Sequence, residues 1–287
     1  MVEVSIVYDK VRFEEKALYE KTQNKGIKSH MVDAKTLIIG TESKKEDFIL
    51  GDIVLQRSIS HYRGLYITAC LEFLGFTVIN TFKVSEICGN KLITSIALAK
   101  NKIPTPNTHF AFNAESAMET LRKTGFPLVL KPIVGSWGRG IFPLRDRETA
   151  SIILEMREED DSPLSRIYYI QEMIHRPPRD IRCIVIGDQV ITAIYRYSAQ
   201  AEWRTNVARG GKVELAPITK EIEDLALQAA EAVGGSGILG VDMMEDKNRG
   251  LVVHEINNTV EFHGAASVSN TDIAGTIIDY AVNIGRK

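Results

Sequence analysis

The chain has 287 residues, enough for two or three lobes around a cleft, and its 35 basic and 37 acidic side chains leave a formal net charge of only −2. This balance excludes a global electrostatic field that would attract nucleic acid or a membrane surface, so an anionic ligand must meet local basic residues. No apolar run approaches the roughly 20 residues of a membrane span, and three cysteines without metal-ligand spacing predict reduced thiols in the cytoplasm.

The first 80 residues alternate predicted strands with predicted helices. Strands are expected at 2–8, near 30–32, at 52–57 and at 76–79, and helices at 13–23 and 66–73. Alternation at this spacing predicts a small open α/β domain, which we assign to residues 1–82.

The middle of the chain, residues 83–165, is expected to form a second lobe. A single helix is predicted over residues 84–100, because prolines at 104 and 106 cannot continue its hydrogen bonding. The pattern then predicts a helix at 114–124, an apolar strand at 126–132 and a return strand at 141–144. The acidic run at 157–161 is expected to be the exposed end of a helix.

The remaining residues, 166–287, are expected to form a third lobe. Strands are predicted at 167–172, 180–186 and 189–197, followed by a helix at 222–233 and a hairpin over 240–257.

The hairpin carries the residues most informative about chemistry. A turn at 246–250 would place Asp242 opposite Glu255, and Asn257 projects from the same strand face as Glu255 because side chains alternate along a strand. Two carboxylates and an amide are hard oxygen donors suited to Mg²⁺, whose coordination is usually completed by water and substrate phosphates. The sequence therefore predicts a magnesium site that binds a nucleotide.

A glycine-rich loop follows the predicted strand that ends near Lys131. Its three glycines at 135, 138 and 140 let the backbone approach a phosphate and present several N–H donors. The loop lacks both the Walker-A order and the G-x-G-x-x-G pattern, and an ordinary tight turn is the alternative interpretation.

Two lysines are candidates for phosphate binding. Lysine is rarely buried without a partner, so Lys131 on an apolar strand and Lys91 on a helix are expected to meet an anion, with a surface position as the alternative. Residues 171–174 end a strand whose backbone groups could bind an adenine edge, or could belong to a plain edge strand.

These motifs, taken in order, resemble those of the ATP-grasp carboxylate–amine ligases, and the resemblance spans nearly the whole chain. Residues 135–139, 204–211 and 257–262 further resemble the LysX group, which is akin to the RimK glutamate ligases. The resemblance implies an α/β fold with an N-terminal open domain, a central lid lobe and a C-terminal lobe, with ATP between two antiparallel sheets.

The same resemblance implies a reaction. Members activate a carboxylate as an acyl phosphate, and an amine then displaces the phosphate. In the LysX group the carboxylate belongs to the C-terminal glutamate of a small acidic carrier protein, LysW, and the amine to 2-aminoadipate or glutamate, for lysine or arginine biosynthesis. Asn258 and Thr259 are similar to the 2-aminoadipate type. Alternatives are glutamate as the amine, a RimK-like ligase that extends a protein tail, and a regulatory nucleotide-binding protein without turnover.

The residue patterns and the resemblance together assign four roles. The metal ligands are Asp242, Glu255 and Asn257, and the catalytic residues are Arg204, Arg209 and Lys131. ATP binding is assigned to Lys91, Lys131, Gly135, Ser136, Trp137, Gly138, Arg139, Gly140, Gln171, Glu172, Met173, Ile174, Asp180, Arg182 and Asn206. The amino-acid substrate is assigned to Arg196, Val207, Ala208, Asn258, Thr259 and Glu261.

Several of these residues have a second interpretation. Arg204 and Arg209 can form paired hydrogen bonds with an acyl phosphate or a carboxylate, but the segment could be a solvated loop. Glu261 could instead pair with an arginine. His254 is expected on the opposite strand face from Glu255, as part of the core. The turn at 176–179 carries two arginines that could receive an acidic carrier tail, and a homo-oligomer, dimer or tetramer, is expected by resemblance.

Overall fold

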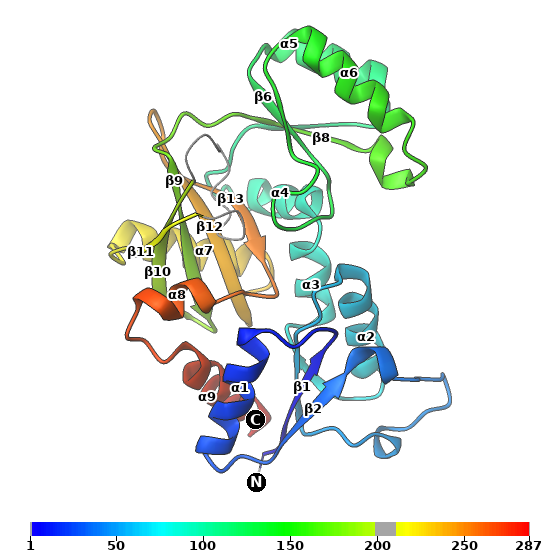
Figure 1. The fold of residues 1–287 in the computed structure, drawn as a ribbon, viewed down its shortest axis with the longest axis vertical. Coiled ribbons are helices and arrows are strands. Elements are labelled where there is room, and N and C mark those ends of the chain that lie inside the picture. The colour runs from blue at the N-terminus through cyan, green and yellow to red at the C-terminus, as the bar shows by residue number, and fades with distance from the viewer. Residues whose placement is uncertain (1, 199–210, 287) are drawn as a thin grey trace.

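The computed structural model describes residues 2–198 and 211–286 of the chain (Figure 1). Its N-terminal part is a parallel sheet with the strand order β2-β1-β3-β4. The strands are β1 (Val4–Tyr8), β2 (Ser29–Asp33), β3 (Ile53–Gln56) and β4 (Thr77–Ile79), with the helices α1 (Phe13–Asn24) and α2 (His61–Phe73) and the short 3-10 turns Ala34–Thr36 and Lys45–Asp47. The predicted open α/β arrangement of this region is confirmed.

The connection to the rest of the chain is formed by two helices, α3 (Phe82–Cys88) and α4 (Lys91–Lys100). The prediction of one helix over residues 84–100 is therefore wrong. The Asn90 side chain accepts hydrogen bonds from the backbone amides of Leu92 and Ile93, which starts a new helix at Lys91. This cap places Lys91 in the first turn of α4, at the site described below.

The central sheet is antiparallel and has the order β5-β8-β6-β7. Its strands are β5 (Thr108–Ala111), β6 (Leu128–Lys131), β7 (Phe142–Leu144) and β8 (Tyr168–Glu172), accompanied by α5 (Ala114–Thr124), α6 (Arg147–Glu158) and the 3-10 turn Pro163–Arg166. No pattern in the sequence predicted β5. Because β8 pairs on both sides, the alternative that residues 171–172 belong to an edge strand is wrong.

One face of the central sheet is covered by α5 and α6. Leu128 and Leu130 of β6 pack with Leu121 of α5 and Leu154 of α6 in one buried cluster. Side chains alternate along a strand, so Lys131 points to the opposite face, away from these helices. The packing of the leucines thus directs the lysine toward the remainder of the protein.

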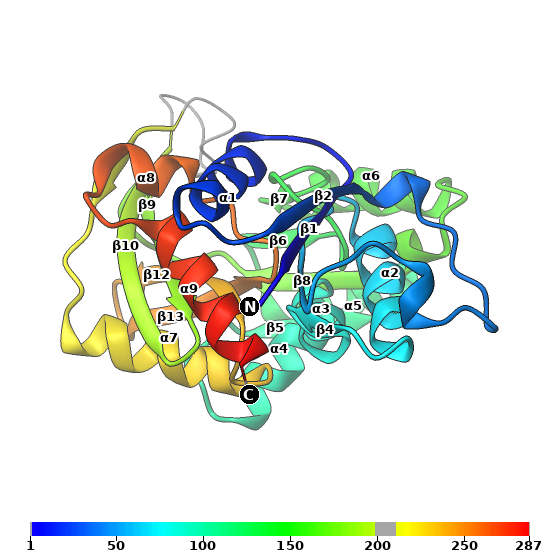
Figure 2. The same ribbon diagram turned by 90° about the horizontal axis from the view of Figure 1, so that it is seen from below.

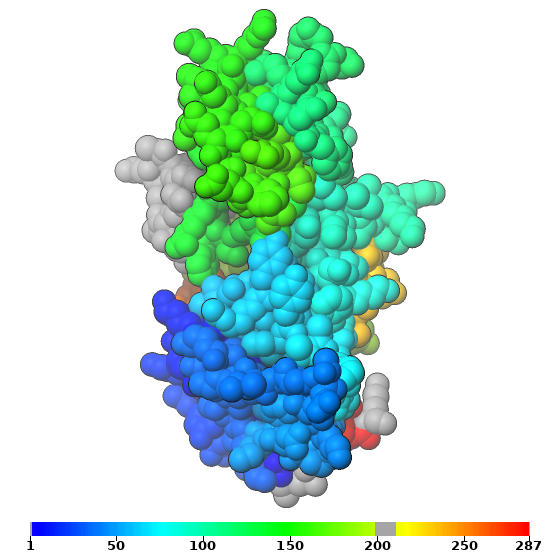
Figure 3. All heavy atoms as spheres, turned by 90° about the vertical axis from the view of Figure 1, so that its right-hand side faces the viewer, coloured from blue at the N-terminus to red at the C-terminus, as the bar shows by residue number. Residues whose placement is uncertain are grey.

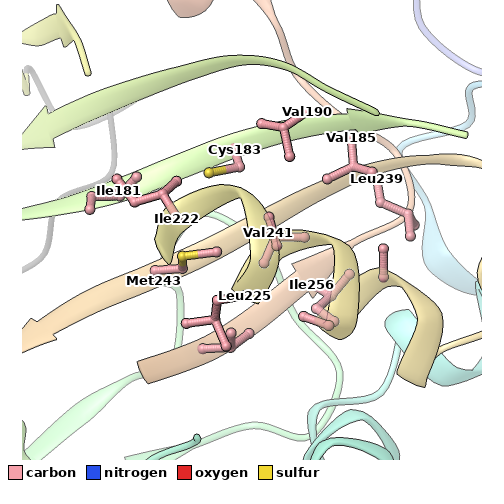
Figure 4. Close-up of a cluster of buried hydrophobic side chains, with 14 of the residues drawn as sticks. Ile181, Cys183, Val185, Val190, Ile222, Leu225, Leu239, Val241, Met243 and Ile256 are labelled. Atoms are coloured by element: carbon pink, nitrogen blue, oxygen red, sulfur yellow. The ribbon is translucent and has the colours of Figure 1, made fainter. Parts of the chain in front are cut away.

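The third sheet is antiparallel and has the order β11-β10-β9-β12-β13. Its elements are β9 (Arg179–Ile186), β10 (Gln189–Tyr197), β11 (Val213–Leu215), β12 (Ile238–Asp246) and β13 (Gly250–Asn257), with α7 (Lys220–Ala232), α8 (His263–Val268) and α9 (Ile273–Gly285). Ile222 and Leu225 of α7 pack on Cys183, Val241 and Met243 (Figure 4). Cys183 is therefore a core residue, as expected.

The last helix connects the third sheet to the N-terminal part of the chain. Ile277 and Ile278 of α9 share one buried cluster with Ile53 of β3 and Ile184 of β9. Figure 2 shows α9 beside α1, and Figure 3 shows the N-terminal residues at one end of the molecule and the middle of the chain at the other. Among the described residues, no helix combines the length and apolar character required to cross a membrane.

Candidate active site between the two antiparallel sheets

The hairpin of β12 and β13 has the register that its sequence predicts. Asp242 lies opposite Glu255, and Gly240 lies opposite Asn257. All three predicted metal-ligand side chains, those of Asp242, Glu255 and Asn257, line one cavity. The turn residues after Asp246 therefore fixed the pairing that brings the carboxylates together.

A β-bulge in this hairpin changes the placement of His254. The register shifts between Asp242 and Met243, so His254 is the extra residue of β13. The His254 side chain lies 3.9 Å from Asp180 Oδ2 and lines the same cavity as Glu255. The expectation that His254 faces away from Glu255 is therefore wrong, because the bulge interrupts the simple alternation of side chains. Neither ring nitrogen has a hydrogen-bond partner in the described part of the protein.

The cavity has a volume of about 430 Å³ and is bounded by all three regions of the chain. The third sheet and the segment after it contribute Asp180, Arg182, Ile194, Arg196, Asp242, Met244, His254, Glu255, Asn257, Thr259, Glu261, His263, Gly264 and Ala265. The helical connection, the central sheet and the loops beside them contribute Lys91, Lys131, Pro132, Gly135, Ser136, Trp137, Gly138, Arg139, Ile141 and Arg176. The N-terminal part contributes Arg12, Phe13, Glu14 and Ile59.

Asp242 is buried, at 1% exposure, and it is surrounded by two arginines. Arg182 donates from Nε and Nη2 to its two oxygens at 2.7 Å each, and Arg196 Nη2 lies 3.0 Å from Oδ2. Burial alone would raise the pKa of Asp242, but the two guanidinium groups hold it well below its usual range. The carboxylate is therefore ionised at neutral pH.

The predicted metal ligands retain oxygen atoms for a cation. Asp242 Oδ1 accepts one hydrogen bond, from Arg182, and a carboxylate oxygen has two lone pairs. Asn257 donates its Nδ2 to Asp242 Oδ2 at 3.3 Å, which turns its Oδ1 away from that carboxylate. In residues 2–198 and 211–286, no three His, Cys, Asp or Glu side chains gather closely enough to hold a metal ion. Two carboxylates and an amide thus suit Mg²⁺ only if phosphates and water complete the coordination.

The two predicted phosphate lysines lie at the cavity. Lys131 is 7% exposed and donates to Gln171 Oε1 at 2.6 Å, and burial lowers its pKa to about 8. Lys91 Nζ lies 2.9 Å from Glu255 Oε1 and donates to the carbonyl of Gly135 at the same distance. Lys91 therefore connects the carboxylate of Glu255, a predicted metal ligand, to the glycine-rich loop.

The glycine-rich loop covers part of the cavity. Trp137, Gly138 and Gly140 all have positive φ angles, between 57° and 66°, which explains why glycine occupies two of these positions. Trp137 Nε1 donates to Glu261 Oε1 at 3.1 Å, and Arg12 Nη1 donates to the same oxygen at 2.8 Å. Glu261 therefore does pair with an arginine while it also lines the cavity.

The N-terminal residues of the site were missed by sequence reasoning. Arg12 and Glu14 stand at the start of α1, and their partners are about 250 positions away along the chain. Phe13 stacks on His263 with ring centroids 4.5 Å apart, and both line the cavity. No local pattern in the sequence marks these residues, because their role depends on packing between distant segments.

Other predicted site residues lie elsewhere. Gln171 contributes indirectly, since its side chain holds Lys131 and bonds Tyr169 and Thr108. The set Gly140, Gln171, Glu172, Met173, Ile174 and Asn258 does not line the cavity, and its roles stay predictions. Arg204, Asn206, Val207, Ala208 and Arg209 lie outside the residues that the structure describes.

The remaining arginines have defined partners. Arg196, predicted to clamp the amino-acid substrate, is 5% exposed and binds Asp180 with two hydrogen bonds of 2.8 Å. Arg179 is paired with Glu245 at 2.8 Å, whereas Arg176 lines the cavity. Of the two arginines proposed to receive an acidic tail, Arg176 is thus the one directed to the site.

Comparison with known proteins agrees with this geometry. Residues 88–281 match a family model described as the RimK-like ATP-grasp domain, and residues 4–87 match the LysX preATP-grasp domain. The chain is 36% identical over 279 residues to the alpha-aminoadipate–LysW ligase LysX of Saccharolobus solfataricus, covering 96% of this chain and 99% of that protein. It is 32% identical over 282 residues to the glutamate–LysW ligase ArgX of Sulfolobus acidocaldarius, covering 98% of each.

The fold is shared with solved structures. A RimK domain ATP-grasp protein from Sphaerobacter thermophilus superposes with a TM-score of 0.79 at 21% identity, over 98% of this chain and 99% of that one. The predicted ATP-grasp fold is therefore confirmed.

Proposed function

Because the chain belongs to the RimK-like ATP-grasp family and its N-terminal region is a LysX preATP-grasp domain, we propose that it joins 2-aminoadipate to a small acidic carrier protein of the LysW type. The resemblance seen in the motifs is confirmed, and the protein is an ATP-dependent carbon–nitrogen ligase. The proposed acceptor is the C-terminal glutamate carboxylate of the carrier, and the nucleophile is the amino group of the amino acid.

One observation carries the proposal: Lys131, Asp242, Glu255 and Asn257 line a single cavity beneath a glycine-rich loop. A carboxylate that attacks the γ-phosphorus of ATP brings two anions together, so positive charge must offset their repulsion. Lys131 and Arg176 can supply it from the nucleotide side. Asp242, Glu255 and Asn257 are the proposed Mg²⁺ ligands, and the ion, when bound, would neutralise phosphate charge.

The proposed reaction has two balanced steps. A carrier carboxylate oxygen bonds to the γ-phosphorus as the bond to the β-phosphate oxygen breaks, which yields an acyl phosphate and ADP. The amine then bonds to the acyl carbon, phosphate leaves, and the nitrogen loses a proton to form the amide. Acyl phosphates hydrolyse in water, so the loop containing Trp137 has the second task of excluding solvent.

The choice of amine rests on the residues after Asn257. Asn258 and Thr259 favour 2-aminoadipate, and Thr259 lines the cavity. Because relatives named for 2-aminoadipate and for glutamate are similar to the chain at 36% and 32% identity, glutamate is the alternative, and a RimK-like glutamate addition to a protein tail is the next. We also propose that the protein acts in the cytoplasm. We propose that it forms a symmetric homo-oligomer, a dimer or a tetramer, and light scattering would measure the molar mass that decides between them.

The test compares amines with one carrier. Purified protein, Mg²⁺ and ATP are mixed with an acidic carrier ending in glutamate and with either 2-aminoadipate or glutamate. Phosphate release and the mass of the carrier are followed together. We expect both to change only in the complete mixture, and faster with 2-aminoadipate. Equal rates for the two amines would remove the argument from Asn258 and Thr259, and an unchanged carrier mass with both would refute the function.

A further inference from the structure

The segment 258–263, between β13 and α8, leaves the sheet at a defined point. Gly240 pairs with Asn257 in the antiparallel ladder, so a continued ladder would pair Ile238 with Thr259. Instead, β13 ends at Asn257 although β12 extends back to Ile238. Something other than the next residue of β13 must satisfy the backbone of Ile238.

The side chain of Asn80 takes this place. Its Nδ2 donates to the carbonyl of Ile238 at 2.8 Å, and its Oδ1 accepts from the Ile238 amide at 2.7 Å. Nδ2 also donates to the carbonyl of Asn258 at 2.6 Å. Asn80 is 4% exposed and follows β4, so an N-terminal side chain occupies the position that Thr259 would take in the sheet.

Two further N-terminal side chains hold the rest of the segment. Arg57, which follows β3, donates from Nη2 to the carbonyl of Val260 at 2.9 Å. Glu14 of α1 accepts from the backbone amides of Phe262 and His263 at 3.0 and 3.1 Å. Arg57 and Glu14 are 6% and 4% exposed, so these are buried contacts rather than surface contacts.

The contacts fix which side chains of the segment face the cavity. Val260 and Phe262 are each 1% exposed and pack in the cluster that contains Ile6 and Ile53 of the N-terminal sheet. The alternate residues Thr259 and Glu261 line the cavity.

We propose that the N-terminal lobe sets the amino-acid selectivity of the enzyme by acting as a template for the segment 258–263. Asn80, Arg57 and Glu14 are positioning residues: each holds a backbone group of the segment, and together they place Thr259 and Glu261 against the amino-acid substrate. The inference rests on the proposed function. It adds that selectivity depends on residues more than 150 positions before those that contact the substrate.

The test separates amino-acid recognition from ATP binding. In Asn80→Ala the segment loses a buried hydrogen-bond donor, and the amide and the carbonyl of Ile238 both lose their partner. We therefore expect the KM for the amino acid to rise about tenfold and the preference between 2-aminoadipate and glutamate to narrow. The KM for ATP should stay within about twofold, since Asn80 is hydrogen-bonded to the backbone of Ile238 and Asn258, which are not proposed ATP-binding residues. Asn101→Ala, which removes an exposed side-chain bond to the carbonyl of Ala97, is the control and should behave as the unmodified enzyme.

A second pair of variants covers the case in which Asn80→Ala does not fold. Glu14→Ala removes the acceptor for the amides of Phe262 and His263, whereas Glu14→Gln keeps a carbonyl oxygen there. We expect Glu14→Ala to raise the KM for the amino acid about tenfold, which corresponds to the loss of buried hydrogen bonds. Glu14→Gln keeps an acceptor there, so its KM for the amino acid should stay close to that of the unmodified enzyme. Equal changes in the KM values for ATP and amino acid, or no change in amine preference, would overturn the inference. Failure of the unmodified enzyme to use either amine would instead refute the proposed function.

Discussion

Replacement of Asp242 by asparagine should stop ligation and also lower the stability of the protein. The carboxylate is 1% exposed and stands between Arg182 and Arg196, whose side chains are 15% and 6% exposed. Asparagine has nearly the same size, so the change removes the negative charge without opening a cavity. Among the described residues, the change leaves Arg182 without an anionic partner and Arg196 with Asp180 as its anionic partner.

The magnitude follows from the burial of this triad. Removing one partner of a buried ion pair costs about 3–5 kcal/mol, because the remaining charge is left in a poorly solvated environment. At about 2–4 °C for each kcal/mol, the midpoint of thermal unfolding should fall by about 10 °C. The matched control is Asp279→Asn, which breaks an ion pair with Lys25 in which Asp279 is 59% exposed. Exposed pairs contribute about 0–1 kcal/mol, so this variant should melt within a few degrees of the unmodified protein.

The assay combines calorimetry without nucleotide and phosphate release in the complete reaction mixture. An Asp242→Asn protein that melts together with the control would show that the two arginines do not depend on this carboxylate. If the variant melts at a lower temperature but still ligates, the ion pairs of Asp242 with the two arginines are supported, and its assignment as a metal ligand is refuted. The two measurements therefore test the electrostatic and the catalytic assignment separately.

Four further outcomes are expected. Burial lowers the pKa of Lys131 to about 8, so the free enzyme loses this charge as the pH rises through that value, and kcat/KM for ATP should fall there. The Lys131→Arg variant stays charged, and its kcat/KM should not decline in this pH range. Trp137→Phe removes the bond to Glu261, and the ratio of phosphate released to product formed should rise severalfold as water reaches the acyl phosphate. Chelation of divalent cations should abolish turnover, and added Mg²⁺ should restore it. His254→Leu removes two buried nitrogens that have no hydrogen-bond partner among the described residues, and it should raise the KM for ATP without lowering the melting temperature.

The parts of the site that the sequence predicted correctly are set by local rules. The turn residues after Asp246 fix a hairpin register, and the register alone places Asp242 opposite Glu255. Lys131 was expected in a buried position because it ends an apolar strand, and the alternation of Leu128 and Leu130 directs it away from the helices. Each of these inferences uses residues within about 20 positions of each other.

The errors occurred where a single residue changes a local pattern. Asn90 splits a helical stretch that periodicity alone would continue, because its side chain caps the second helix. The bulge at His254 adds one residue to β13 and turns that side chain toward the cavity. Neither feature alters the apolar pattern by much, so a prediction based on periodicity detects neither the break between the two helices nor the bulge.

The charges of the cavity explain how a site that is closed by ion pairs can accept a nucleotide. Among the described residues that line it, Arg12, Lys91, Lys131, Arg139, Arg176, Arg182 and Arg196 are basic, and Glu14, Asp180, Asp242, Glu255 and Glu261 are acidic. The surplus of positive charge favours a magnesium–triphosphate complex, which keeps net negative charge, over either the free cation or a neutral ligand. Lys91 is paired with the carboxylate of Glu255, a proposed metal ligand, and bonded to Gly135 of the loop. Glu255 would be one of the residues that hold the magnesium ion, and Lys91 would then be available to bind a phosphate. If Lys91 turns to the phosphates, we expect nucleotide binding to change the position of the glycine-rich loop through this lysine.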